Sequence, residues 1–192
     1  MFTKKKEFDT FVKEQEILQY CEEPVQLANG GQSHYYLNWR TASEDVWTLD
    51  KLTDLLLEII EEEGFKPDTI FGVAEGATKI AIMLQYKWAK RSQYFGKESH
   101  VLAMGRGKEK THGTKKERLF LGKPKGRTLL IEDVTTTGNS LLTAIENLQN
   151  QDVTITTVLV LTERNKKSLE EQIEKQGISY LALSHISEYM PI

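Results

Sequence analysis

The stretch that decides the fold is TLLIEDVTTTGNS, residues 128–140. It opens with an apolar run, 128–131, which is typical of a strand buried on both faces of a parallel sheet. A helix is expected next, because apolar residues then recur at helical spacing: Leu141, Leu142, Ile145 and Leu148. The sequence therefore predicts a strand, a turn and a helix in that order.

The turn between this strand and helix has the chemistry of a phosphate site. Residues 135–140 offer hydroxyls and backbone N–H groups at the positive end of a helix. Glu132 and Asp133 come just before, and two carboxylates would repel a phosphate unless they had another partner. Suitable partners for the two carboxylates are a divalent cation or the vicinal hydroxyls of a ribose. An ordinary turn whose Thr and Ser residues cap the helix would explain one or two hydroxyls, but not the acidic pair.

The string IEDVTTTGNS resembles the 5-phosphoribosyl 1-diphosphate (PRPP) signature of the type I phosphoribosyltransferases. That signature is a hydrophobic run, two acids, a hydrophobic residue and a T-T-G-type loop. The resemblance implies that the acids bind the ribose hydroxyls and that the loop binds the 5-phosphate. The PRPP contacts that it implies here are Glu132, Asp133, Val134, Thr135, Thr136, Thr137, Gly138, Asn139 and Ser140.

The composition sets limits on the class of protein. The chain has 192 residues, enough for one compact domain with a substantial core. Its net charge of -3 gives no overall field that would attract nucleic acid or an anionic membrane, so neither partner is expected. Cys21 is the single cysteine, and the sequence has no 18-residue apolar run. We therefore expect a soluble, cytoplasmic protein without an internal disulfide.

Strands and helices are expected to alternate along the chain. A helix is predicted over 49–63, and buried strands over 69–74, 101–104, 128–131 and 154–161. This alternation predicts an α/β fold, with a mainly parallel sheet flanked by helices. Ligands in such sheets bind beyond the carboxyl ends of the strands. Three segments are therefore expected to meet at one site: 75–78, 132–140 and 162–165.

A long polar segment, 105–125, separates two of the predicted strands and is rich in Lys and Arg. Long segments of this kind often cover an active site, and clustered cations suit a pyrophosphate. A solvated charged hairpin is the alternative. Within it, RGKEKTHG resembles the mobile catalytic hood of orotate phosphoribosyltransferases, R-K-x-x-K-x-H-G. The resemblance assigns catalytic and PRPP-binding roles to Arg106, Lys110 and His112.

The hood also departs from the family pattern. Gly107 stands where a second Lys is usual, and Lys108 follows one place later. In the family this loop folds across the active site of the neighbouring subunit. The resemblance thus implies a type I phosphoribosyltransferase fold with a flexible hood loop, 105–125, in a homodimer whose hood reaches the neighbouring site.

Two further segments favour orotate as the base. In VLVLTERN, Arg164 follows an acid as in the family's D-R pair, and a guanidinium there can bind the carboxylate that distinguishes orotate from uracil. A surface ion pair with Glu163 is the alternative. GGQSHYYLNWR resembles the family segment S-G-x-x-S-x-Y-Y/F-x-x-x-R, which lies over the pyrimidine. The orotate contacts implied are Tyr35, Tyr36, Thr136 and Arg164, although the two tyrosines alternate as in a strand and would also suit a core.

Two positions lack cations that the family usually has. Ala28 stands where a Lys commonly precedes the first Gly of the base-covering segment. Glu75 and Gly76 follow the strand at 69–74, where bacterial members often have Tyr-Lys. Lys79 lies three residues further on, and the sequence leaves open whether it reaches the pyrophosphate.

Taken together, the resemblance implies an orotate phosphoribosyltransferase of pyrimidine (UMP) biosynthesis, which makes orotidine 5'-monophosphate and pyrophosphate from PRPP and orotate. Mg²⁺ is expected to bind through PRPP, with no metal held directly by protein side chains. The whole chain, 1–192, is expected to form one domain in which residues 1–48 cover the base. Two alternatives stay open at this point: a phosphoribosyltransferase for a purine or another base, and a PRPP-binding regulator on the same fold.

Overall fold

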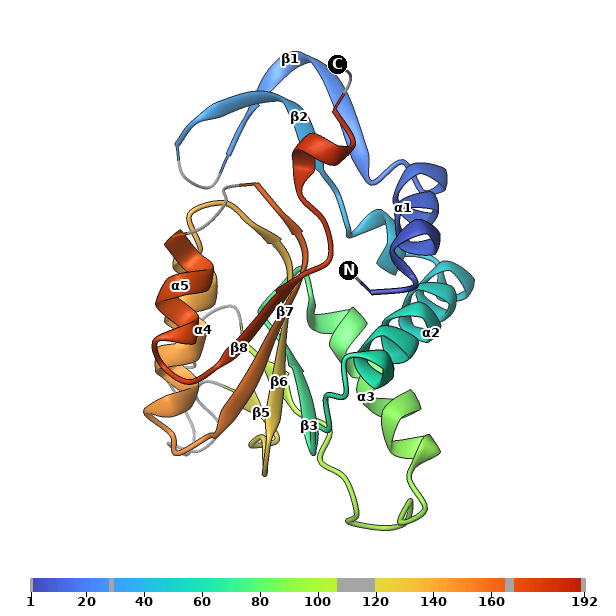
Figure 1. Cartoon of the computed structure of the whole chain (residues 1–192), viewed down its shortest axis with the longest axis vertical. Helices are drawn as coiled ribbons and strands as arrows, with labels where there is room; N and C mark the ends of the chain where they lie inside the picture. The colour runs from blue at the N-terminus through green and yellow to red at the C-terminus, as the bar shows by residue number, and fades with distance from the viewer. Residues whose placement is uncertain (1, 28–29, 107–119, 165–167, 191–192) are drawn as a thin grey trace.

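A four-stranded parallel sheet lies at the centre of the molecule (Figure 1). The computed structural model describes residues 2–27, 30–106, 120–164 and 168–190. The strand order is β3-β6-β7-β8, with bounds β3 Thr69–Gly72, β6 Thr128–Thr135, β7 Ile155–Glu163 and β8 Ser179–Ala182. The predicted α/β class with a mainly parallel sheet is confirmed.

Helices cover both faces of this sheet (Figure 1). One face carries α1, α2 and α3, and the other carries α4 and α5. Their bounds are α1 Lys5–Glu14, α2 Val46–Glu62, α3 Thr78–Arg91, α4 Asn139–Gln149 and α5 Ser168–Glu174. The central strand β6 serves both cores, because Leu129 and Ile131 pack with the α2 and α3 side while Leu130 packs with the α4 and α5 side. This double burial explains the continuous apolar run of β6.

An antiparallel hairpin lies over the carboxyl ends of the central strands (Figure 1). It is formed by β1 (Leu18–Gln26) and β2 (Gln32–Leu37). Trp39, just after β2, is fully buried and stacks with Phe8 and Phe11 of α1. These aromatic contacts fix the end of β2 against the body of the protein.

The strand predicted over 101–104 is wrong in extent and in place. The structure has the short strand β4 (Met104–Gly105), which pairs antiparallel with β5 (Phe120–Leu121) outside the main sheet. The carbonyl of Val101 instead accepts a hydrogen bond of 2.8 Å from the side chain of Gln85, and Leu102 is exposed. A side-chain donor therefore takes the place of a neighbouring strand.

The described residues also include the short 3-10 helices η1 at Thr41–Ser43 and η3 at Ile186–Glu188. In the described parts of the chain, no helix is both long enough and apolar enough to cross a membrane.

Candidate active site

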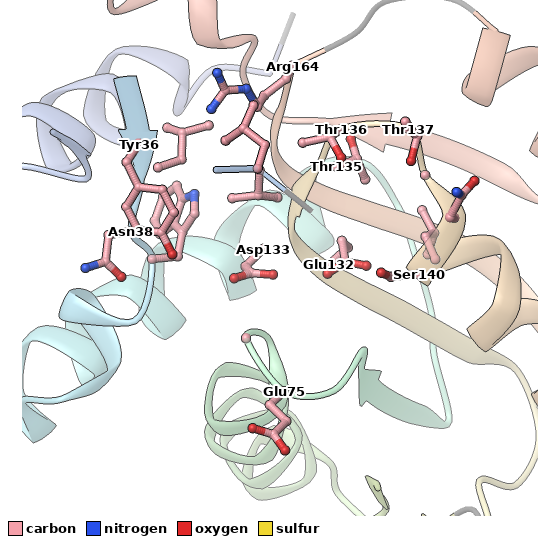
Figure 2. A pocket seen from close by; sticks show the side chains of 18 of the residues that line it. Tyr36, Asn38, Glu75, Glu132, Asp133, Thr135, Thr136, Thr137, Ser140 and Arg164 are labelled. Carbon is pink, nitrogen blue, oxygen red and sulfur yellow. The ribbon is translucent and has the colours of Figure 1, made fainter. Parts of the chain in front are cut away.

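A pocket of about 370 Å³ opens at the carboxyl ends of β3, β6 and β7, against the end of β2. Its lining comes from residues 26–27, 36–40, 74–76, 132–141 and Arg164. Figure 2 shows Tyr36 and Arg164 toward one end of the view, Thr137 and Ser140 toward the other, and the acids Glu132 and Asp133 between them. The structure thus brings together the strand ends that the sequence placed at one site.

One end of the pocket is the turn between β6 and α4. All nine of the PRPP contacts predicted in this segment line the pocket, from Glu132 through Ser140. The helix α4 begins after Gly138, its N-cap residue, which has no side chain that could cap the helix. The N–H groups of the first turn of α4 therefore present the positive end of the helix dipole at this end of the pocket.

Gly138 makes this turn possible. Its φ of +79° lies in the left-handed region, and a Cβ there would come within 2.4 Å of Leu169 Cδ1. Both the backbone conformation and the space next to α5 exclude a side chain. The buried hydroxyl of Thr135, a few residues earlier, has no hydrogen-bond partner within the described residues.

The two acids differ in their environments. Glu132 is only 6% exposed, and burial together with the neighbouring Asp133 raises the pKa of Glu132 to about 9. Glu132 is therefore protonated at neutral pH in this structure. The loop after β3 packs closely against Asp133: a Cβ on Gly76 would lie only 2.1 Å from Asp133 Oδ2. The carboxyl oxygens of the pair are suited to hydroxyl or cation partners.

The other end of the pocket is formed around Arg164, just after β7. Its guanidinium donates to the carbonyl of Tyr35 and to Ser33 Oγ, both at 3.0 Å, so the side chain joins the hairpin to the sheet. Burial lowers the pKa of Arg164 from its ordinary value. Tyr36 lines the pocket, whereas Tyr35 does not; the ring of Tyr35 packs edge-on against Tyr20, with centroids 5.5 Å apart.

A buried chain of hydrogen bonds supports this end. Trp39 Nε1 donates to Thr162 Oγ1 at 3.1 Å, and Thr162 Oγ1 lies 3.0 Å from Ser184 Oγ. Sequence reasoning missed Trp39, Asn38 and Gln26 as pocket residues. The polar Asn38 between two apolar residues at the end of a strand was the signal available for this segment.

Two of the other cations considered from the sequence, Arg106 and Lys79, lie away from the pocket. Arg106 lines a smaller cavity of about 70 Å³ beside Phe71 and Phe120. Lys110 and His112 fall outside the described residues, as does Ala28. The ammonium group of Lys79 donates to the carbonyl of Ser43 at 3.2 Å, and Lys79 is not a lining residue of the pocket. In its place Glu75 and Gly76 line the pocket at the end of β3.

Comparison with known proteins finds similarity to phosphoribosyltransferases in both sequence and structure. Residues 47–188 match the family described as "Phosphoribosyl transferase domain". The chain is 32% identical to the orotate phosphoribosyltransferase of Pyrococcus furiosus, over 84% of this chain and 83% of that protein. The crystal structure of orotate phosphoribosyltransferase from Aeropyrum pernix superposes with a TM-score of 0.70 at 26% identity, covering 93% of each chain.

A more distant structure shares the fold. The orotate phosphoribosyltransferase of Mycobacterium tuberculosis, solved in complex with PRPP, has a TM-score of 0.65 at 20% identity, over 96% of this chain and 97% of that one.

Proposed function

Because this chain belongs to the phosphoribosyl transferase domain family, and to the orotate phosphoribosyltransferases within it, we propose that it transfers the ribose 5-phosphate of PRPP to orotate. The products are orotidine 5'-monophosphate and pyrophosphate, in pyrimidine biosynthesis. One observation carries the proposal: a single pocket joins the N-terminus of α4, a pair of acids and a half-buried guanidinium. These groups suit, in that order, a phosphate, a ribose and a carboxylate.

The segment from Glu132 to Ser140 is proposed to bind the ribose 5-phosphate. The amides of α4 and the hydroxyls of Thr136, Thr137 and Ser140 would surround the phosphate, and the acids would accept hydrogen bonds from the ribose hydroxyls. With Glu132 protonated at neutral pH, it can also donate one hydrogen bond to a ribose oxygen.

The base is proposed to bind between Tyr36 and Arg164, with Thr136 at its edge. The guanidinium has five N–H donors, and its two hydrogen bonds to the hairpin leave donors for the orotate carboxylate. For Tyr35 the structure favours a role for its backbone carbonyl, which orients Arg164, over a contact between its ring and the base.

Mg²⁺ is proposed as the cofactor, bound with PRPP. Among the described residues, no group of three or more His, Cys, Asp and Glu is arranged to hold a metal ion. The ion is therefore proposed to be held by PRPP beside the acid pair and not directly by protein side chains. When bound, Mg²⁺ would neutralise charge that develops on the departing pyrophosphate.

The hood is proposed to complete the site from a neighbouring subunit. Arg106 and Lys110 would neutralise the departing pyrophosphate, and His112 would donate a hydrogen bond or a proton to it. Arg106 lines another cavity of its own chain and not this pocket, so the role proposed for Arg106 requires the hood, 105–125, to reach the site of the partner in a homodimer. The single domain over 1–192, with 1–48 over the base, and the cytoplasmic location stay predictions.

The proposed function is tested by following the ultraviolet absorbance of orotate in the presence of Mg²⁺ and PRPP, with uracil, adenine and hypoxanthine as parallel substrates. We expect PRPP-dependent loss of orotate alone. Turnover of a purine instead would contradict the base assignment. PRPP binding without turnover of any base would contradict the activity and favour a PRPP-binding regulator.

The hood has its own test in Lys110→Ala. Because the departing pyrophosphate gains most of the negative charge in the transition state, kcat should fall far more than PRPP affinity. Equal losses in both would contradict a catalytic role for Lys110.

A further inference from the structure

Arg164 makes hydrogen bonds through its main chain as well as through its side chain. Its N–H donates to the carbonyl of Thr135, at the end of β6, over 2.9 Å. Its carbonyl lies 3.1 Å from Nε2 of His185, a residue of the C-terminal segment. Together with the two hydrogen bonds from the guanidinium to the hairpin, four contacts from three separate parts of the chain fix this one residue.

The hydrogen bonds of His185 define which ring nitrogen carries the proton. Nδ1 accepts from the backbone N–H of Ser187 at 3.2 Å and lies 2.7 Å from Ser187 Oγ. Because Nδ1 is an acceptor, Nε2 carries the hydrogen and donates it to the carbonyl of Arg164. The two nitrogens thus have separate roles: Nδ1 caps η3, and Nε2 holds Arg164.

The segment that carries His185 is itself anchored. The N–H of His185 donates to Glu188 Oε1 at 2.7 Å, and Glu188 forms an ion pair of 2.5 Å with Lys5 of α1. The hydroxyl of Tyr189 donates to Asp9, also on α1, at 2.6 Å. On the other side, the N–H of Glu163 donates to the carbonyl of Ser184 at 2.9 Å. His185 is therefore a fixed support for Arg164.

We propose that His185 is a positioning residue for recognition of the base carboxylate: its Nε2–H holds the Arg164 backbone so that the guanidinium meets orotate in one orientation. This inference rests on the proposed function, in which Arg164 binds that carboxylate. His185 is not a lining residue of the pocket, so it acts through Arg164 alone. Its loss should weaken orotate binding and leave PRPP binding and the chemical step unchanged.

Two substitutions separate the roles of the ring nitrogens. In His185→Gln the side-chain amide can take the place of Nε2 and donate to Arg164, whereas the cap on Ser187 is lost. In His185→Asn the shorter side chain can take the place of Nδ1 and keep the cap, but it does not reach Arg164. Both remove the imidazole, and each keeps one of its two hydrogen bonds.

Steady-state kinetics with orotate and PRPP, alongside thermal melting of each variant, tests the proposal. We expect His185→Asn to raise the KM for orotate about three- to tenfold, with kcat and the KM for PRPP within about twofold of the original protein. His185→Gln should keep the KM for orotate within about twofold, even where its melting temperature is the lower of the two.

The opposite order would overturn the proposal, because an impaired His185→Gln beside a normal His185→Asn would make the cap the only role of the ring. Equal KM values in both variants and the original protein would overturn it as well. Failure of the proposed function gives a different result, because the unsubstituted protein would then bind PRPP and consume no orotate. That result would remove the basis of the proposed function and of the role proposed for His185.

Discussion

The two ends of the pocket are built in different ways. The phosphate end comes from one continuous segment, Glu132 to Ser140, whose strand, turn and helix follow each other in the sequence. The base end is assembled from the end of β2 and from Arg164, more than 120 residues apart, and is held by hydrogen bonds between them. Local backbone geometry therefore determines the first end, and tertiary packing determines the second.

The largest effect is expected at the base end, from Arg164→Ala. The substitution removes the partner of the orotate carboxylate and the two hydrogen bonds to the hairpin. We expect kcat/KM for orotate to fall about 100-fold or more, because loss of one member of a desolvated charge pair costs about 2–5 kcal/mol. PRPP affinity, measured by titration calorimetry, should change less than about threefold.

Arg164→Lys is the matched control, since it keeps the charge and loses the planar pair of donors. It should regain only a small part of the lost activity. A variant Arg164→Ala that loses PRPP and orotate affinity equally would contradict the separation of the two ends.

At the phosphate end, Gly138→Ala should weaken PRPP about tenfold or more. The new Cβ would strain a backbone with φ of +79° and collide with Leu169, so the turn must shift. Orotate specificity should persist in the remaining activity. Titration with PRPP measures the loss.

Gly177→Ala serves as the control for backbone strain alone. Its φ is +76°, but nothing lies within 4 Å of the added Cβ. We expect it to lower the free energy of unfolding by about 1 kcal/mol and leave PRPP affinity unchanged. Equal PRPP affinities in the two Gly→Ala variants would show that the turn does not shape the phosphate end.

A third prediction concerns the pH dependence of stability. Burial and Asp133 raise the pKa of Glu132 from 4.5 to about 9 in the folded protein. Between these pH values the folded state keeps a proton that the unfolded state has released, so Glu132 makes the free energy of unfolding fall as pH rises. The slope from this one group is at most about 1.4 kcal/mol per pH unit.

Glu132→Gln should remove that slope, because the amide does not titrate. Urea denaturation of both proteins from pH 5 to 9, without substrate, measures the difference. If the difference in unfolding free energy between the two proteins is the same at every pH, then the raised pKa of Glu132 is wrong.

The smallest effect is expected from Trp39→Phe. It keeps an aromatic ring against Phe8 and removes the hydrogen bond to Thr162, which should raise the KM for orotate about two- to fivefold. Trp88→Phe is the control, since Trp88 Nε1 donates to Pro67 far along the sheet from the site. It should leave the KM for orotate unchanged, and a rise of the same size in both variants would contradict a specific role for Trp39.

The same contrast explains how much the sequence could predict. The α/β class, the β6 to α4 segment and the acids follow from local patterns, and the fold and family expectations are confirmed. The carboxyl ends of parallel strands meet at one edge, so Arg164 could also be placed near the acids.

The base end could not be predicted in the same way. Tyr35 and Tyr36 are neighbours on β2, so their side chains point to opposite faces, and only the packing of Tyr35 against Tyr20 shows which of the two rings faces the pocket. Trp39 is apolar by sequence, and its hydrogen bond to Thr162 depends on a contact over 123 positions of the chain. The role proposed for His185 likewise depends on the fold of the C-terminal segment. The site roles of Arg106, Lys110 and His112 stay predictions.

The most direct measurement is a crystal structure of the protein with orotidine 5'-monophosphate, which spans both ends of the pocket. We predict the 5'-phosphate at the N-terminus of α4, the ribose hydroxyls on Glu132 and Asp133, and the base carboxylate on the guanidinium of Arg164. A phosphate bound away from α4, or a carboxylate bound away from Arg164, would contradict the division of the pocket into a phosphate end and a base end.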